Sequence, residues 1–236
     1  MKIVFNLFTI IFLLFVSTGM VAQKVIEKGT VKMEITKVSS DDPQMAMGLE
    51  MMKGSQTELI FKEDQYVTNM DMMGGMMKIQ VHIEKSKNMM NMLMDMMGNK
   101  SWIESKLDET QTVQQKAIAE QTKLEYDKSD TKEILGYKCY KMTITNPEME
   151  GISVTGYVTE DIKTKANLIQ GFQSIELAGY TMEFTISNPK FSMTMTAVDV
   201  NEKVDDSKFS FDTKGYKKMT MAELQKSMGG MGGFGF

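Results

Sequence analysis

The chain has 236 residues, a formal charge of −4 at neutral pH, one cysteine, one histidine, 27 methionines and no arginine. An acidic chain without the forked guanidinium group is a poor partner for nucleic acid, whose phosphates require clustered positive charge. A single cysteine excludes an internal disulfide, and one cysteine with one histidine cannot supply an ordinary zinc site.

The first 22 residues have the three-part order of a secretory signal peptide. Lys2 supplies the positive start, residues 7–16 form a short run that is apolar except for Thr9, and small residues follow up to Ala22. The run is too short to span a bilayer comfortably, and no cysteine lies near the end of this region to carry a lipid. We therefore expect cleavage after Ala22 and export of a soluble protein to the periplasm or outer envelope of a Gram-negative bacterium.

Alternation of apolar and polar residues predicts strands with one face on a core and one face in water. The alternation occupies residues 31–36, 78–84, 152–158, 182–187 and 191–197. Asn-Pro pairs at residues 146–147 and 188–189 mark the ends of strands. Such patterns are typical of antiparallel sheets.

Few helices are expected. Asp42 and Pro43 begin one that runs to about Lys53, and a capping box at Thr220 begins another that ends near Met228. Residues 108–120 are a third candidate. Residues 23–228 are thus expected to form one β-rich domain, followed by a flexible glycine-rich tail at 229–236.

Fifteen methionines lie between Met45 and Met97, in three clusters at 45–52, 70–77 and 89–97. In the third cluster they occupy every second position, so that on a strand they project from one face. Met70 and Met72 form a similar pair before a turn at Gly74-Gly75. The alternating residues of the third cluster are Met90, Met92, Met94 and Met96.

Three interpretations of these clusters stay open from the sequence. Methionine can fill irregular gaps in a core. It can also line a pliable cavity or groove for a lipid, an acyl chain or an apolar peptide, with Met70, Met72, Met90, Met92, Met94 and Met96 as candidate ligand-binding residues. Thioethers also suit Cu(I), and the spacing of Met70, Met72, Met73 and Met76 fits a soft-metal site. His82 falls on the polar face of its strand and is expected at the surface.

The sequence contains no recognisable catalytic machinery. A Ser-His mechanism would need the one histidine and a Gly-x-Ser-x-Gly turn, which is absent, and there is no Walker-type loop. Cys139 is expected to be buried and inert. We therefore expect a protein that is not an enzyme and needs no cofactor.

Residues 136–141 (GYKCYK) and 209–219 (FSFDTKGYKKM) resemble the exported DUF4412 family of Bacteroidetes. The end of the chain more distantly resembles the LolA/LolB-like lipoprotein carriers. The resemblance implies a strongly curved antiparallel sheet wrapped around helices, with an apolar cavity for acyl chains. It implies no catalytic residues, and the lack of arginine leaves unsupported any carrier mechanism that requires one.

Together these observations predict a mainly β (α+β) fold, built as a strongly curved antiparallel sheet or half-open barrel with two or three short helices. The expected function is non-catalytic binding of a hydrophobic ligand in a methionine-lined cavity, with possible transient contacts to membrane or envelope proteins. The alternatives are Cu(I) binding and a structural or adhesive role in the envelope through the glycine-rich tail. The sequence predicts no oligomeric state.

Overall fold

The computed structural model describes residues 25–110, 120–147, 149, 151–169, 172 and 175–228. The expected signal peptide, the expected tail at 229–236 and most of the helix candidate at 108–120 lie outside these residues. The extent of the domain at 23–228 also stays a prediction.

The strands that the structure describes join in one 12-stranded sheet, in the order β12-β6-β5-β4-β3-β2-β1-β11-β10-β9-β8-β7. All neighbours are antiparallel except β12, which pairs in parallel with β6. The strands are β1 (Lys28–Ser40), β2 (Gln56–Lys62), β3 (Gln65–Met72), β4 (Met77–Glu84), β5 (Met89–Met96), β6 (Asn99–Lys106), β7 (Lys123–Ile134), β8 (Tyr137–Thr145), β9 (Ser153–Thr159), β10 (Tyr180–Ser187), β11 (Phe191–Asn201) and β12 (Lys217–Lys218).

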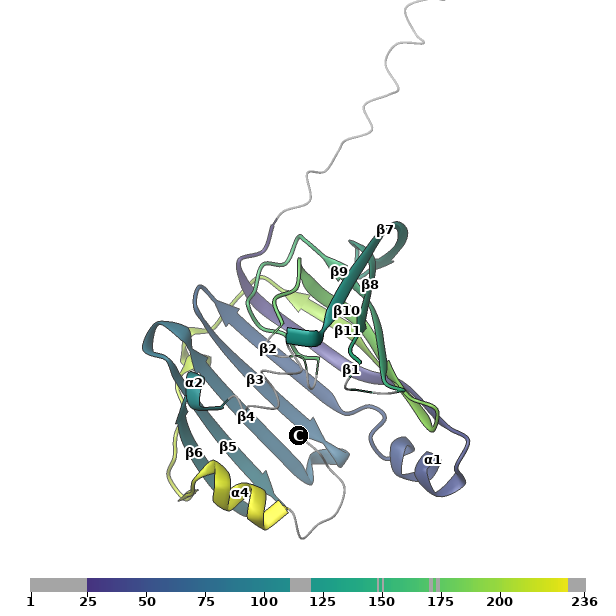
Figure 1. The fold of residues 1–236 in the computed structure, drawn as a ribbon. Coiled ribbons are helices and arrows are strands. Elements are labelled where there is room, and N and C mark those ends of the chain that lie inside the picture. The colour runs from purple at the N-terminus through teal and green to yellow at the C-terminus, as the bar shows by residue number, and fades with distance from the viewer. Residues whose placement is uncertain are drawn as a thin grey trace, which may run out of the picture.

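Two meanders, β1–β6 and β7–β11, are joined by the pairing of β1 with β11. Irregularities in register interrupt β1 against β11, β9 against β10, and β7 against β8, and bulges of this kind bend a sheet and increase its twist. The two meanders therefore form two walls of an open trough, with β2–β6 on one side and β7–β10 on the other (Figure 1). The expected mainly β fold with a strongly curved antiparallel sheet is confirmed.

Both helices predicted from capping residues are present, although α1 (Pro43–Glu50) does not extend to about Lys53 as expected. In α1 the Asp42 carboxylate accepts from the backbone N–H groups of Gln44 and Met45, at 2.8 and 3.2 Å. Before α4 (Met221–Met228) the Thr220 N–H donates to the Glu223 carboxylate at 2.7 Å, and the Glu223 N–H donates back to the Thr220 hydroxyl at 3.2 Å. The helices α1, α4 and the single turn α2 (Leu107–Thr110) are all too short or too polar to cross a membrane.

The main core lies between the walls, where β1 and β2 face β8–β10 and the buried side chains of Ile162, Ala166, Ile169 and Phe172. Met33, Met142 and Met182 are fully buried there, which agrees with core filling by isolated methionines. Four of the five stretches of alternating residues lie within strands, the fifth begins one residue before β9, and both Asn-Pro pairs follow strand ends. Because this core occupies only part of the trough, the inner side of β3–β6 has a separate environment.

Candidate functional site

The strand register collects methionines from three strands on one face of the sheet. Partners across antiparallel strands point to the same side, so each row of partners shares one surface. One row contains Met70 of β3, Ile79 of β4 and Met94 of β5. The neighbouring row consists of Met72, Met77 and Met96.

We call this surface the methionine face. All six candidate ligand-binding residues belong to it. They come from two separate clusters of the sequence, and only the pairing of the strands shows that they share one face. That they bind a ligand stays a prediction. The methionine face is formed by Met70, Met72, Met77, Ile79, Val81, Ile83, Met90, Met92, Met94, Met96 and Ile103.

Burial on the methionine face is intermediate between that of a core and that of a surface. Met90 and Met94 are 6% and 4% exposed, whereas Met70, Met72, Met92 and Met96 are half-buried. The methionines of the main core are fully enclosed. The methionine face thus presents thioether side chains that are sheltered from water and still accessible in part.

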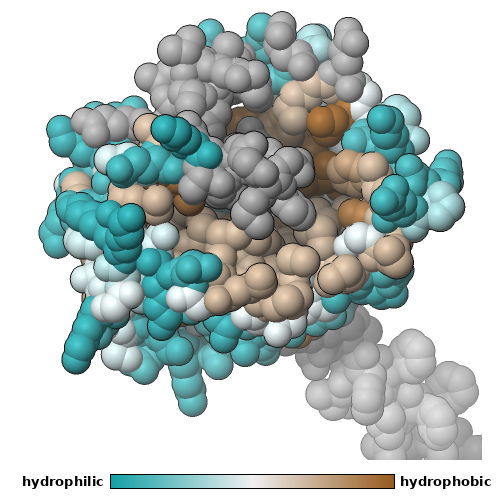
Figure 2. Space-filling model, turned by 90° about the horizontal axis from the view of Figure 1, so that it is seen from below, coloured by the Kyte–Doolittle hydropathy of each residue, from teal (hydrophilic) through white to brown (hydrophobic). Residues whose placement is uncertain are grey.

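The helix α4 covers part of the methionine face. Leu224 is buried in a cluster with Ile79, Met94 and Ile103, and Met219 and Met221 pack against the same cluster. In Figure 1, α4 lies in front of β5 and β6, on the trough side of the sheet. Seen from below, apolar side chains gather over the middle of the molecule and hydrophilic ones surround them (Figure 2).

One end of the methionine face carries a tyrosine and a lysine. Tyr66 is in the row of Ile83 and Met90, and its burial raises the pKa of its hydroxyl to about 12. The Lys85 ammonium, in the turn that follows β4, lies 6.0 Å from the centre of the Tyr66 ring. Burial lowers the pKa of Lys85, and the neighbouring charge of Lys165 lowers it further.

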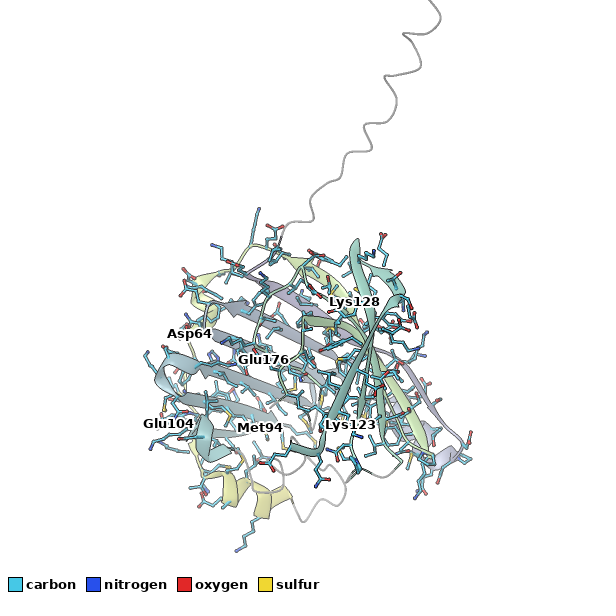
Figure 3. The ribbon with its side chains drawn as sticks, turned by 45° about the horizontal axis from the view of Figure 1, so that its top comes forward. Asp64, Met94, Glu104, Lys123, Lys128 and Glu176 are labelled. Carbon is cyan, nitrogen blue, oxygen red and sulfur yellow. The ribbon has the colours of Figure 1, made fainter. Side chains whose placement is uncertain are left out.

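The opposite wall of the trough is more polar along its edge. Met94 lies on the wall formed by β2–β6, whereas Lys123 and Lys128 lie on β7 across the trough (Figure 3). Lys128 is paired with Glu160 at 3.0 Å, so its charge is already compensated. The methionine face therefore lies opposite a wall whose β7 edge carries lysines.

The residues of the metal interpretation occupy two different settings. Met70 and Met72 lie on the methionine face, whereas Met73 begins the 3-10 turn η2 (Met73–Gly75) with a φ of 55°. Met76 follows this turn and is 45% exposed. Within the described residues no group of three or more His, Cys, Asp or Glu side chains could hold a metal ion. Binding of Cu(I) through the four thioethers stays a prediction.

The expectation that His82 lies at the surface is wrong. It does lie on the polar face of β4, but it is only 6% exposed, because Phe211 covers it with ring centres 4.9 Å apart. Its Nε2 is buried without a hydrogen-bond partner among the described atoms. Burial lowers the pKa of His82, and a hydrogen bond with the Phe209 backbone offsets this in part.

Cys139 is buried in the main core, as expected, and burial raises the pKa of its thiol to about 12. The thiol therefore stays protonated at neutral pH and is a poor nucleophile. His82 lies on the other side of the sheet, under the C-terminal segment, which carries Phe209 and Phe211. The structure does not bring this cysteine and this histidine together.

No protein-family model and no curated protein matches the chain. The DUF4412 and carrier resemblances therefore stay predictions from the sequence. Among solved structures, the chain is similar to lipoprotein LppX of Mycobacterium tuberculosis, with a TM-score of 0.36, 10% identity, and coverage of 76% of this chain and 89% of LppX.

Two further solved structures give similar values. For LprF of Mycobacterium bovis the TM-score is 0.33 at 12% identity, and for a DUF1329 family protein of Desulfovibrio piger it is 0.34 at 8% identity. Each comparison covers 78% of this chain and 90% of the other. With TM-scores below 0.5, we infer neither fold family nor function from these likenesses.

Proposed function

We propose that the protein binds the acyl chain of a lipid on the methionine face and catalyses no reaction, after export to the cell envelope. The observation that best supports this proposal is the half-burial of Met70, Met72, Met92 and Met96 on an apolar face that α4 covers in part. Water is displaced from such a face when a hydrophobic ligand binds, and this displacement provides the driving force.

The dimensions of the methionine face suit one acyl chain. Met90 and Met96 are six residues apart on β5, which corresponds to about 20 Å of strand. One leaflet contributes about 15 Å to the hydrocarbon core of a bilayer. A lipid acyl chain therefore fits along β5 without leaving the apolar surface.

The sheet favours an acyl chain over an apolar peptide. A peptide brings backbone N–H and C=O groups that need partners when buried. The central strands β3, β4 and β5 are each paired on both sides, so their own backbone groups are engaged in the sheet. An acyl chain has no such requirement, and it needs only apolar contact.

Methionine is suited to ligands that differ in length or unsaturation. Its side chain is unbranched and flexible, so the same face can repack around different shapes. Each buried methylene contributes about 0.8 kcal/mol, which corresponds to roughly fourfold in affinity. We therefore expect affinity to rise steeply with chain length until the methionine face is filled.

Native mass spectrometry tests this proposal. Protein purified from its own host without detergent should carry lipid adducts, and these should dissociate on denaturation. In titrations with saturated fatty acids of increasing length, the affinity should rise about fourfold per methylene and then level off. Bare protein from the host, together with no fatty-acid binding at any length, contradicts the proposal.

Export is a separate part of the proposal. Residues 1–22 lie outside the described part of the chain, so the structure does not bear on export. It is supported by the three-part order of these residues alone. N-terminal sequencing of the protein from a periplasmic or extracellular fraction should start at Gln23. Full-length protein in the cytoplasmic fraction argues against export.

A further inference from the structure

A second concave site opens on the other side of the sheet, away from α4, and Met70 and Ile79 of the methionine face also border it. It is a groove of about 400 Å³ across the outer face of β1–β5. This volume lies within the range of small-molecule sites. The residue Tyr216, from the segment that follows β11, forms one wall of the groove.

Two neighbouring rows of the sheet line this groove with polar side chains. The first row runs through Lys32, Glu58, Asn69, Gln80 and Leu93, and the second runs through Gln56, Asp71 and Lys78. Adjacent strands are about 4.8 Å apart, and alternate residues along a strand are about 7 Å apart. Hydrogen-bonding groups are therefore presented on a grid with dimensions similar to those of a sugar ring.

Not all of these groups are engaged within the protein. The Asn69 amide donates to the Glu58 carboxylate at 3.2 Å, and Lys78 lies 3.9 Å from Asp71. Within the part of the chain that the structure describes, the side chain of Gln80 has no hydrogen-bond partner. Gln80 is half-buried between Asn69 and Leu93 in its row, so its amide is placed to bond a ligand.

Tyr216 is held in place by its neighbours. The Lys100 ammonium lies 5.4 Å from the centre of its ring, and its backbone N–H donates to the Thr213 carbonyl at 3.0 Å. Leu93, also at the groove, is 4% exposed. The groove thus combines an aromatic wall and an apolar patch with an array of amides and carboxylates.

The charges of the lining indicate a neutral ligand. Lys32 and Lys78 are balanced by Glu58 and Asp71, so the groove has no excess positive charge for a phosphate or sulfate. A neutral ligand that offers both hydroxyl groups and an apolar C–H face matches this lining. We propose that the outer groove binds a neutral carbohydrate, with the ring of Tyr216 stacked on a sugar and the amide of Gln80 bonded to its hydroxyls.

The full chain offers an internal reporter for this test. Trp102 is the one tryptophan and pairs with Leu93 in the same cross-strand row. Its fluorescence, together with saturation-transfer NMR of the sugars, should follow titration with maltose, cellobiose and N,N′-diacetylchitobiose. Glucose 6-phosphate serves as the anionic comparison.

We expect saturable binding of at least one neutral disaccharide and weaker binding of the phosphate. Both Gln80→Ala and Tyr216→Ala should lower the affinity about tenfold, whereas Gln65→Ala, on the same face of β3 but outside the groove, should not change it. Tyr216→Phe retains the ring and should retain the affinity. If Tyr216→Ala does not fold by circular dichroism, Gln80→Ala decides alone.

Three results would overturn the proposal: no binding of any of the neutral sugars, binding that Gln80→Ala leaves unchanged, or a preference for the sugar phosphate. This experiment is independent of lipid binding, because none of the substituted residues lies on the methionine face.

Discussion

The clearest case of a residue whose chemistry is controlled by burial is Cys139. Its thiol lies in the main core, and burial raises its pKa from the ordinary 9.0 to about 12. Reaction with a thiol reagent requires the thiolate, so this shift alone lowers the rate about a thousandfold near pH 8. The folded chain should react with iodoacetamide far more slowly than the urea-unfolded chain, as measured by mass spectrometry. Equal rates would show that the thiol is accessible.

His82 makes stability depend on pH. Burial lowers its pKa in the folded chain below the ordinary 6.5, so the unfolded chain binds a proton at a higher pH than the folded chain does. The contribution of neutral His82 to stability is therefore fully present above about pH 6.5 and is lost as the pH falls towards the folded-state pKa.

Denaturant unfolding of the wild type and of His82→Gln tests this dependence. The wild type should lose more stability than the variant between about pH 7.5 and pH 5.5, because the variant lacks the titrating group. Carboxylates titrate in both proteins, so the difference between the two isolates His82. Parallel pH profiles would contradict the burial of a neutral imidazole.

At the scale of elements, the approach of β9 to β10 leaves no room for a side chain at Gly156. A Cβ there would lie 2.6 Å from the Glu183 carbonyl oxygen and 3.2 Å from the Phe184 Cβ. Gly156→Ala should therefore destabilise the protein by about 1–3 kcal/mol. Thermal or urea unfolding measures the change.

Gly48 provides the matched control. It lies in α1, and no heavy atom is within 4 Å of a Cβ added there. Gly48→Ala should stabilise the protein by about 0.5–1 kcal/mol, because alanine has a higher helix propensity than glycine. Equal effects of the two substitutions would mean that the contact between β9 and β10 is not as tight as the structure shows.

Local sequence patterns predicted the strands and helices that have either a simple apolar-polar alternation or a clear capping residue. Alternation identified strands that are covered on one side, and capping residues identified α1 and α4. The strands β2, β6, β7 and β12 were not predicted. In β2, Leu59, Ile60 and Phe61 are all buried, so the alternation is lost. In β7 a polar and charged run with a shift in register separates Leu124 and Tyr126 from Ile134, so the alternation is interrupted.

Contacts between segments that are distant in the sequence could not be predicted from local patterns. The burial of His82 depends on Phe211, and the outer groove depends on Tyr216, both from the last part of the chain. The period of β4 correctly predicted the side on which His82 lies, but it contains no information about what covers that side. By contrast, the one-sided methionine row of β5 depends only on period and was predictable.

At the scale of the whole molecule, the curved sheet separates two environments. Its inner side holds the main core and the methionine face, and its outer side is polar except where the C-terminal segment covers it. The pairing of β1 with β11 unites the two walls, so residues far apart in sequence define the trough. An apolar face and a largely polar groove thus lie on opposite sides of one sheet.

Titration with a fluorescent fatty-acid probe tests lipid binding most directly. The variant Met92→Gln/Met96→Gln makes two half-buried positions of the methionine face polar at similar side-chain volume. The control Met47→Gln/Met51→Gln makes the same change at two exposed methionines in and just after α1. We predict saturable binding to the wild type and to the control, and an affinity at least about tenfold lower for the first variant. Equal affinities of the two variants, with both folded by circular dichroism, would contradict binding at the methionine face.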